Sequence, residues 1–153
     1  MPLRTGSALP ELGGAAGWIN GEPRSAKLAG KPLLIHFWSV SCHICHDVAG
    51  EVAAWHAKYG PRGLRIVGVH QPRGPAELDV AAVTADALGP MCITWPSAVD
   101  NSHAIAGRFE NQFVPAYYLF DGDGTLVHRQ AGDRGFERLH TKIEELLGVH
   151  AAA

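Results

Sequence analysis

The sequence predicts an α/β protein in which a mixed central sheet carries helices on both of its faces. Short apolar runs alternate with segments of helical periodicity in the order βαβαβαββα. One of these runs, at residues 33–38, is almost continuously apolar, which is typical of a strand buried on both faces. The chain has 153 residues, which is the usual length of one domain. We therefore expect a single domain over residues 1–153.

The first half of the chain contains two expected strands and one long helix. Residues 1–16 are rich in Gly, Ala and Pro and are expected to be irregular. Residues 18–23 indicate a short strand that enters a turn at Asn20-Gly21, where positive φ angles are tolerated. After the buried strand, a helix is expected over residues 42–59. Its apolar stripe recurs at helical spacing and consists of Val48, Val52, Trp55 and Tyr59.

The second half continues the alternation of strands and helices. A helix is expected over residues 77–88, with an inward face of Leu78, Ala81, Ala82, Ala85 and Leu88. The Gly-rich segment 121–124 predicts a hairpin turn between two strands. The remaining expected elements are strands at 64–70, near 97–99, at 116–120 and at 126–131, and helices at about 102–109 and at 135–147. Residues 148–153 are expected to be a frayed tail.

The composition excludes several classes of protein. The net charge is −2, so no basic surplus indicates binding to nucleic acid or to an acidic membrane. No apolar run approaches the roughly 18 residues of a membrane-spanning helix. No apolar leader precedes Trp18, so a cytoplasmic location is expected for the chain as written. An extracytoplasmic location is the alternative if the N-terminus was trimmed.

The three cysteines are too few for a disulfide scaffold, but two of them form the motif Cys42-His43-Ile44-Cys45 where the buried strand gives way to the helix. Free N–H groups and the helix dipole stabilise an anion there and lower the pKa of Cys42 below about 8.5. Cys45 lies one helical turn later, within disulfide reach. Cys42 can therefore attack a substrate disulfide, and Cys45 can resolve the mixed disulfide. The third cysteine, Cys92, is expected to be a small buried hydrophobic residue, with a resolving or regulatory thiol as the alternative.

Residues 31–45 resemble the active-site segment of thioredoxin-like proteins, in particular thiol–disulfide oxidoreductases of the TlpA/ResA and DipZ C-terminal-domain kind. The similarity extends over roughly residues 17–147. It includes Gly68-Val69-His70, residues 95–101 (Trp-Pro-Ser-Ala-Val-Asp-Asn), and residues 114–121 (Val-Pro-Ala-Tyr-Tyr-Leu-Phe-Asp) with Gly122-Asp123-Gly124 after them. The resemblance implies a thioredoxin-like fold.

The resemblance also implies roles for individual residues. Pro115 is expected to be in the cis conformation and to face the two cysteines, while Val114 offers its backbone to an incoming peptide as an added strand. Trp38 is expected to form a wall of the site. The implied activity is that of a reductase, with protein disulfides as substrates and an upstream dithiol protein as the source of electrons. No organic cofactor and no metal is implied, and a monomer is expected.

Two positions depart from the family pattern. Glu often follows three residues after the second cysteine, where this chain has Val48, and a buried Asp often lies six residues before the first cysteine, where this chain has His36. Because these acidic groups move protons to and from the resolving thiol, His36 is a candidate for the proton relay. The alternative is a buried histidine bonded to a neighbour. His43 either adds positive charge near Cys42 or is a solvated side chain, and structural roles are expected for His46 and Asp47 in the first turn of the helix.

Other interpretations of the same residues remain open. Cys42 to His46 also match the c-type haem attachment signature CxxCH, and the two cysteines with two histidines would provide four ligands for zinc. A peroxiredoxin shares the fold but uses one peroxidatic cysteine, preceded by Ser or Thr at three residues and by Pro at seven. Ser39 fits that pattern and Ile35 does not. A non-catalytic redox-sensing module is the hypothesis from a different class.

Overall fold

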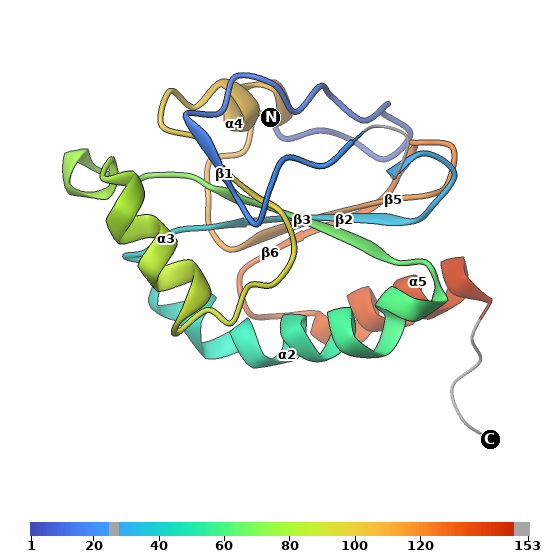
Figure 1. The fold of residues 1–153 in the computed structure, drawn as a ribbon. Helices are drawn as coiled ribbons and strands as arrows, with labels where there is room; N and C mark the ends of the chain where they lie inside the picture. Colours follow the sequence, from blue (N-terminus) through green and yellow to red (C-terminus); the bar gives the residue numbers. More distant parts are fainter. Residues whose placement is uncertain (25–27, 149–153) are drawn as a thin grey trace.

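The computed structural model describes residues 1–24 and 28–148 and confirms the expected α/β architecture around one mixed six-stranded sheet (Figure 1). The strands lie in the order β1-β4-β3-β2-β5-β6. Strands β2, β3 and β4 are mutually parallel, whereas β1, β5 and β6 run antiparallel to their neighbours. The strands are β1 (Gly17–Ile19), β2 (Leu33–Trp38), β3 (Arg65–His70), β4 (Ser97–Val99), β5 (Ala116–Phe120) and β6 (Leu126–Ala131). The described helices are α2 (His43–Tyr59), α3 (Val80–Leu88), α4 (Ala104–Phe109) and α5 (Phe136–Leu147), with short 3₁₀ turns at Gly60–Arg62 and Pro75–Glu77.

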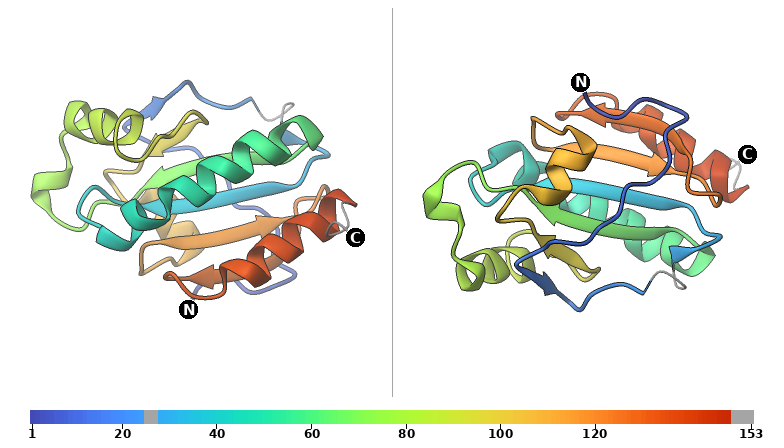
Figure 2. Two further views of the ribbon diagram at one scale, coloured as in Figure 1. Left: turned by 90° about the horizontal axis from the view of Figure 1, so that it is seen from below. Right: turned by 90° about the horizontal axis from the view of Figure 1, so that it is seen from above.

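Helices cover both faces of the sheet, so each face has its own core. Helices α2 and α5 lie along one face, and α4 lies on the other together with the N-terminal segment (Figure 1, Figure 2). The α2-face core contains Leu34, Trp38 and Val52, and the α4-face core contains Ile35 and Phe37. Successive side chains of β2 alternate between these two cores because a strand has a period of two. All six residues of β2 are buried for this reason.

The N-terminal segment, residues 1–16, contains no helix or strand apart from an isolated bridge between Ala8 and Thr125. It is nevertheless tied to the fold, since the Leu9 N–H donates to the Gly124 carbonyl over 2.9 Å. Its apolar side chains pack against the α4-face core, and these are Leu3, Leu9, Leu12 and Ala15. The segment therefore covers a face of the sheet on which α4 is only six residues long.

The bounds of β2, β5 and β6 are those expected from the sequence, and the first strand ends at Ile19, just before the expected turn with φ of 63° at Asn20 and 88° at Gly21. The helix expected at 77–88 is divided into the 3₁₀ turn and α3 by Asp79, whose carboxylate caps α3. The expected tail lies outside the described residues after Gly148, which ends α5. Within the described part of the chain, no helix has both the length and the apolar character needed to cross a membrane.

The predicted inward face of α3 is wrong. Val83 and Ala87 are the buried residues of this helix, whereas Leu78 and Leu88 are 44% and 55% exposed. The three alanines assigned to the inward face, Ala81, Ala82 and Ala85, are exposed as well. Helix α3 packs its narrower apolar stripe against the α2-face core and leaves the wider stripe in solvent.

Candidate active site

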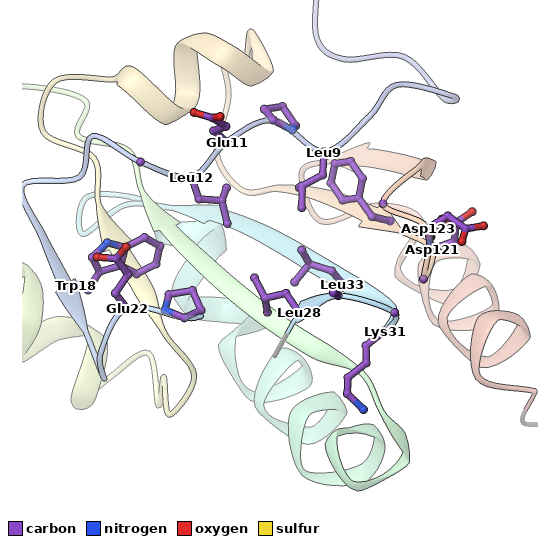
Figure 3. A pocket seen from close by; sticks show the side chains of 18 residues that line it. Leu9, Glu11, Leu12, Trp18, Glu22, Leu28, Lys31, Leu33, Asp121 and Asp123 are labelled. Atoms are coloured by element: carbon purple, nitrogen blue, oxygen red, sulfur yellow. Dashed lines mark hydrogen bonds between the residues drawn. The ribbon is translucent and has the colours of Figure 1, made fainter. Parts of the chain in front are cut away.

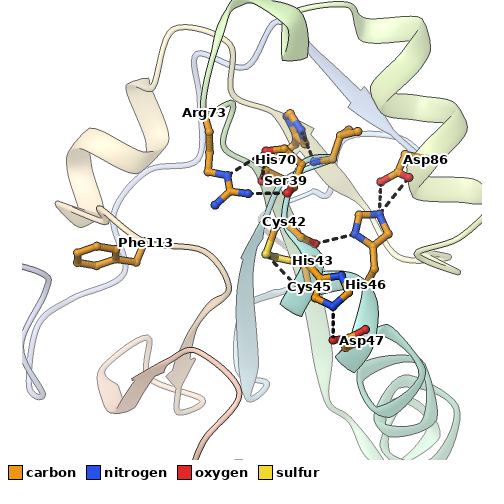
Figure 4. The surroundings of a disulfide bond; sticks show 12 residues. Ser39, Cys42, His43, Cys45, His46, Asp47, His70, Arg73, Asp86 and Phe113 are labelled. Carbon is orange, nitrogen blue, oxygen red and sulfur yellow. Dashed lines mark hydrogen bonds and ion pairs between the residues drawn. A yellow bond between two sulfur atoms is a disulfide. The ribbon is translucent and has the colours of Figure 1, made fainter.

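The two cysteines of the motif are joined by a disulfide at the start of α2 (Figure 4). Cys42 is the N-cap residue of this helix, its Sγ accepts a hydrogen bond from the Cys45 N–H over 3.0 Å, and the two Cα atoms lie 5.2 Å apart. Cys42 retains 3% of its accessible surface, while Cys45 retains none. A sulfur at an N-cap faces free N–H groups and the positive end of the helix dipole, so a thiolate formed here on reduction is stabilised.

The turn before Cys42 is held by two charged side chains from the segment that leads to α3. The Arg73 guanidinium donates to the Ser41 Oγ over 2.9 Å and to the Ser41 carbonyl over 2.6 Å. The Glu77 carboxylate accepts from the Ser41 hydroxyl over 2.9 Å and from the backbone N–H of Arg73 over 3.0 Å. Burial raises the pKa of Glu77, but these hydrogen bonds outweigh it and lower the pKa below its ordinary value. The backbone that carries Cys42 is therefore fixed from its N-terminal side.

Two buried aromatic residues support the same turn from the end of the sheet. His70 Nε2 accepts from the Val40 N–H over 3.2 Å, and burial lowers the pKa of His70 to about 4, so this imidazole is neutral. Trp38 packs edge-on against His70 and donates its Nε1–H to the Ser97 hydroxyl over 3.1 Å. Because Trp38 has no accessible surface, the expectation that it forms a wall for substrate is corrected: in this structure its indole supports the site from within the core.

His36 lies on the central strand β2, stacked on Tyr117 with ring centroids 4.8 Å apart. It is fully buried, and neither ring nitrogen has a hydrogen-bond partner among the described residues. The alternative, a buried histidine hydrogen-bonded to a neighbour, is therefore confirmed for the burial and wrong for the hydrogen bond. Burial lowers the pKa of His36 to about 3, so the imidazole is neutral. Its part in proton transfer stays a prediction.

Two more histidines occupy the first turn of α2. The side chain of His43 is 89% exposed, and its Nε2 lies 3.3 Å from the Asp47 carboxylate. His46 contacts the Cys42 carbonyl through Nδ1 and the Asp86 carboxylate of α3 through Nε2. The i to i+4 spacing of Cys42 and His46 was the available signal for the first contact. The second contact joins residues 40 positions apart, and the sequence alone carried no signal for it.

The Val114–Pro115 peptide bond is cis, as the family resemblance implied. Val114 is half-buried and packs against both cores, of which the α2-face core includes Cys42 and Cys45. Phe113, one residue earlier, is 68% exposed and lies among the residues around the disulfide (Figure 4). The sequence reasoning did not single out this side chain. The roles of Val114 and Pro115 in docking a peptide remain predictions.

The third cysteine and the alternative sites can also be located. Cys92 is exposed, which corrects the expectation of a buried hydrophobic residue, and its φ of 53° places it in a tight turn after α3. Both thiols of the CxxCH motif are engaged in the disulfide. Among the described residues, no group of three or more His, Cys, Asp and Glu side chains is arranged to hold a metal ion.

A separate hollow of about 590 Å³ opens next to the N-terminal segment (Figure 3). Leu9, Leu12, Trp18, Leu28 and Leu33, which line it, belong to or pack against the α4-face core. The hollow contains neither cysteine of the motif, and its acidic side chains are Glu11, Glu22, Asp121 and Asp123. It is therefore not part of the disulfide site, which lies at the start of a helix on the other face of the sheet.

A six-stranded thioredoxin-like fold with a CxxC disulfide at a helix N-terminus defines a thiol–disulfide oxidoreductase. The chain belongs to the AhpC/TSA family, which it matches over residues 6–129. It is 43% identical over 148 residues to the thiol-disulfide oxidoreductase YkuV of Bacillus subtilis, an alignment that covers 96% of this chain and 97% of YkuV.

Two further comparisons agree with this class. The chain is 34% identical to protein DipZ of Mycobacterium tuberculosis over 95% of its own length, but it spans only 21% of DipZ. The solution structure of a thioredoxin-like protein in the oxidized form superposes with a TM-score of 0.85 at 41% identity and covers 95% of this chain and 98% of that chain. The expected thioredoxin-like fold and thiol–disulfide oxidoreductase activity are therefore confirmed.

Proposed function

We propose that the protein reduces disulfides in other proteins, with Cys42 as the attacking thiol and Cys45 as the resolving thiol. The observation that carries this assignment is the difference between the two sulfurs. Cys42 caps the helix and keeps some accessible surface, whereas Cys45 is fully buried behind it. A substrate disulfide reaches Cys42 first, and the helix N-terminus favours the thiolate that must attack.

The exchange proceeds in two steps. The Cys42 thiolate attacks one sulfur of the substrate disulfide, forms a mixed disulfide and releases the other substrate sulfur as a thiolate. Cys45 then loses its proton and attacks the Sγ of Cys42, which releases the second substrate sulfur and closes the Cys42–Cys45 disulfide. The substrate gains two electrons and two protons, and the protein loses them. A dithiol protein restores the reduced state by the same exchange in reverse.

The segment at Val114 and Pro115 supplies the docking position in this proposal. An incoming peptide lies against the backbone of Val114 as an added strand, which aligns its disulfide with Cys42. The packing of Val114 against the core that holds both cysteines supports this placement. The exposed ring of Phe113 adds apolar surface beside the same backbone.

Trapping of the mixed disulfide tests the roles of the two cysteines. We expect the reduced Cys45→Ser variant to accumulate a mixed disulfide with a disulfide-containing protein such as insulin, because the second step is lost. We expect Cys42→Ser to form none. Non-reducing electrophoresis and mass spectrometry of the trapped species identify the bonded cysteine. Cys92→Ser is the control and should behave as the unmodified chain, since its thiol lies outside the motif. Trapping through Cys45 in the Cys42→Ser variant would contradict the assignment.

The direction of electron transfer, from this protein to its substrates, is tested by equilibrating the Cys42–Cys45 pair with glutathione. A potential near that of thioredoxin, about −270 mV, supports a reductase, and one near about −120 mV overturns it. Insulin reduction with dithiothreitol as the electron source should proceed in the same preparation. Consumption of hydrogen peroxide without insulin reduction would favour the peroxiredoxin alternative. A pair that is reduced once and does not turn over would favour a redox-sensing module.

A further inference from the structure

His46 lies between the nucleophilic end of α2 and helix α3, with a hydrogen-bond acceptor at each ring nitrogen (Figure 4). Its Nδ1 is 2.7 Å from the carbonyl oxygen of Cys42. Its Nε2 is 2.8 Å from one carboxylate oxygen of Asp86 and 3.1 Å from the other. The side chains of His46 and Asp86 are mostly buried, with 24% and 15% of their surface exposed. The contact therefore lies in the packed region between α2 and α3.

The protonation of this pair follows from the geometry. A neutral imidazole carries one N–H and uses its other nitrogen as an acceptor. A carbonyl oxygen and a carboxylate are both acceptors, so both contacts are satisfied only when each ring nitrogen carries a proton. His46 is then an imidazolium, paired with Asp86 and bonded to the peptide carbonyl of the residue that holds the reactive sulfur.

We propose that His46, held as an imidazolium by Asp86, is a positioning residue that fixes the Cys42 peptide and favours the thiolate form of Cys42. It acts through the Cys42 carbonyl and through its positive charge close to the helix N-terminus, and it does not contact the reacting sulfur. The inference rests on the proposed role of Cys42 as the nucleophile. It adds a link from α3 to the active site that matches the link made by Arg73 and Glu77 on the other side of Cys42.

The charges around His46 support the imidazolium. Burial lowers the pKa of His46, but the hydrogen bonds to the Cys42 carbonyl and Asp86 and the charges of Asp86 and Asp47 outweigh it and raise the pKa above its ordinary value. Asp86 faces the ring from α3, Asp47 acts from the same helix, and Asp47 is also the partner of His43. As pH rises through the pKa of His46, the ring loses a proton, one of its two hydrogen bonds is lost, and its positive charge no longer favours the thiolate.

The state of the ring can be measured directly in the unmodified chain. Nitrogen-15 NMR of the histidine side chains distinguishes an imidazolium from the two neutral tautomers. We expect His46 to carry protons on both ring nitrogens at pH 7 and to titrate at a higher pH than a histidine in a model peptide. A neutral His46 at pH 7 overturns the proposal, and this result does not depend on whether the protein is a reductase.

The effect on Cys42 is measured with His46→Gln and Asp86→Asn. Gln keeps a hydrogen-bonding side chain without the charge, and Asn removes the partner that holds the proton. In both variants the equilibrium between the dithiol with oxidised glutathione and the disulfide with two reduced glutathiones should shift about tenfold towards the protein disulfide at pH 7. By the two-electron relation this is a potential lower by about 30 mV. The rate of Cys42 alkylation by iodoacetamide at pH 7 should fall by a similar factor.

A pH comparison separates this role from a merely structural one. At pH 5.5 an imidazole of ordinary pKa, about 6.5, is protonated even without a carboxylate partner. At this pH Asp86→Asn should therefore recover most of the alkylation rate that the unmodified chain has at the same pH, and His46→Gln should not. His56→Gln, a histidine further along α2 that bonds Thr94, is the matched control and should leave the glutathione equilibrium unchanged. If both variants lose stability but keep the equilibrium and the alkylation rate of the unmodified chain, the proposal is wrong. Failure of the reductase assignment would instead appear in the insulin assay with the His46 results intact.

Discussion

At the scale of single residues, the histidines near the disulfide differ because their surroundings differ. Among the described residues His36 has no charged partner, and burial lowers its pKa to about 3. The Nε2 of His70 lies 3.7 Å from the Glu77 carboxylate, but burial outweighs this charge and lowers the pKa of His70 to about 4. The side chain of His46 keeps 24% of its surface and has an acceptor at each nitrogen, which raises its pKa. The same side chain is therefore a neutral core residue in two places and a charged contact in the third.

The buried His36 makes a prediction about stability and pH. Its folded pKa lies below the unfolded value of about 6.5, so the unfolded state binds more protons as pH falls from about 6.5 to about 3. The unfolding free energy should decrease with falling pH in that window, and His70 should contribute over a similar range. His36→Leu removes one proton-binding site and should reduce the slope between pH 6 and pH 4.5 by about 1.4 kcal/mol per pH unit. Urea unfolding at several pH values measures this slope for the unmodified chain and the variant.

Ile35→Val is the control for this measurement. Ile35 is the neighbouring buried residue of β2 and does not titrate, so its substitution should lower the unfolding free energy by the same amount at every pH. A slope in His36→Leu equal to that of the unmodified chain would show that His36 is protonated in the folded state. That outcome would contradict the neutral imidazole inferred from its burial.

At the scale of elements, the sequence was sufficient where one signal dominated. The continuous apolar run of β2 and the single apolar stripe of α2 placed both elements and hence Cys42 and Cys45, since the motif lies where the strand ends and the helix begins. Helix α3 carries apolar residues on most of its surface, so its periodicity did not distinguish an inward stripe from an outward one. The contact of Asp86 with His46 depends on that orientation and was missed for the same reason, and the contact of Glu77 with Ser41 joins residues 36 positions apart.

The orientation of α3 can be tested with two truncations. Val83 has no accessible surface, so Val83→Ala should lower the unfolding free energy by about 1.5–3 kcal/mol through lost burial and a small cavity. Leu88 is 55% exposed, so Leu88→Ala should change it by no more than about 0.5 kcal/mol, although more atoms are removed. Chemical denaturation measures both values. A larger loss of unfolding free energy for Leu88→Ala than for Val83→Ala would show that the face expected from the sequence is the buried one.

At the scale of the whole molecule, the sheet separates the chemistry from much of the packing. Both cysteines belong to the α2-face core, and the side chains that hold the active-site turn come from β3, α3 and the segment between them. Among the described residues, neither cysteine belongs to the α4-face core, which α4 and the N-terminal segment cover, and Val114 packs against both cores. From this arrangement we expect substitutions in the α4-face core to change the stability of the fold without changing its redox potential.

A conservative truncation in the α4-face core tests that separation. Ile105 is a fully buried residue of α4, so Ile105→Val should lower the unfolding free energy by about 0.5–1.5 kcal/mol. Because the sheet lies between this side chain and the disulfide, the equilibrium with glutathione should stay within about twofold of the unmodified chain, in contrast to the tenfold shift expected for His46→Gln. Denaturant unfolding of the oxidised protein and the glutathione equilibrium, measured on the same preparation, give the two quantities. A tenfold shift in Ile105→Val would mean that the two cores are coupled through the sheet, and the redox potential would then be a property of the entire fold instead of one end of α2.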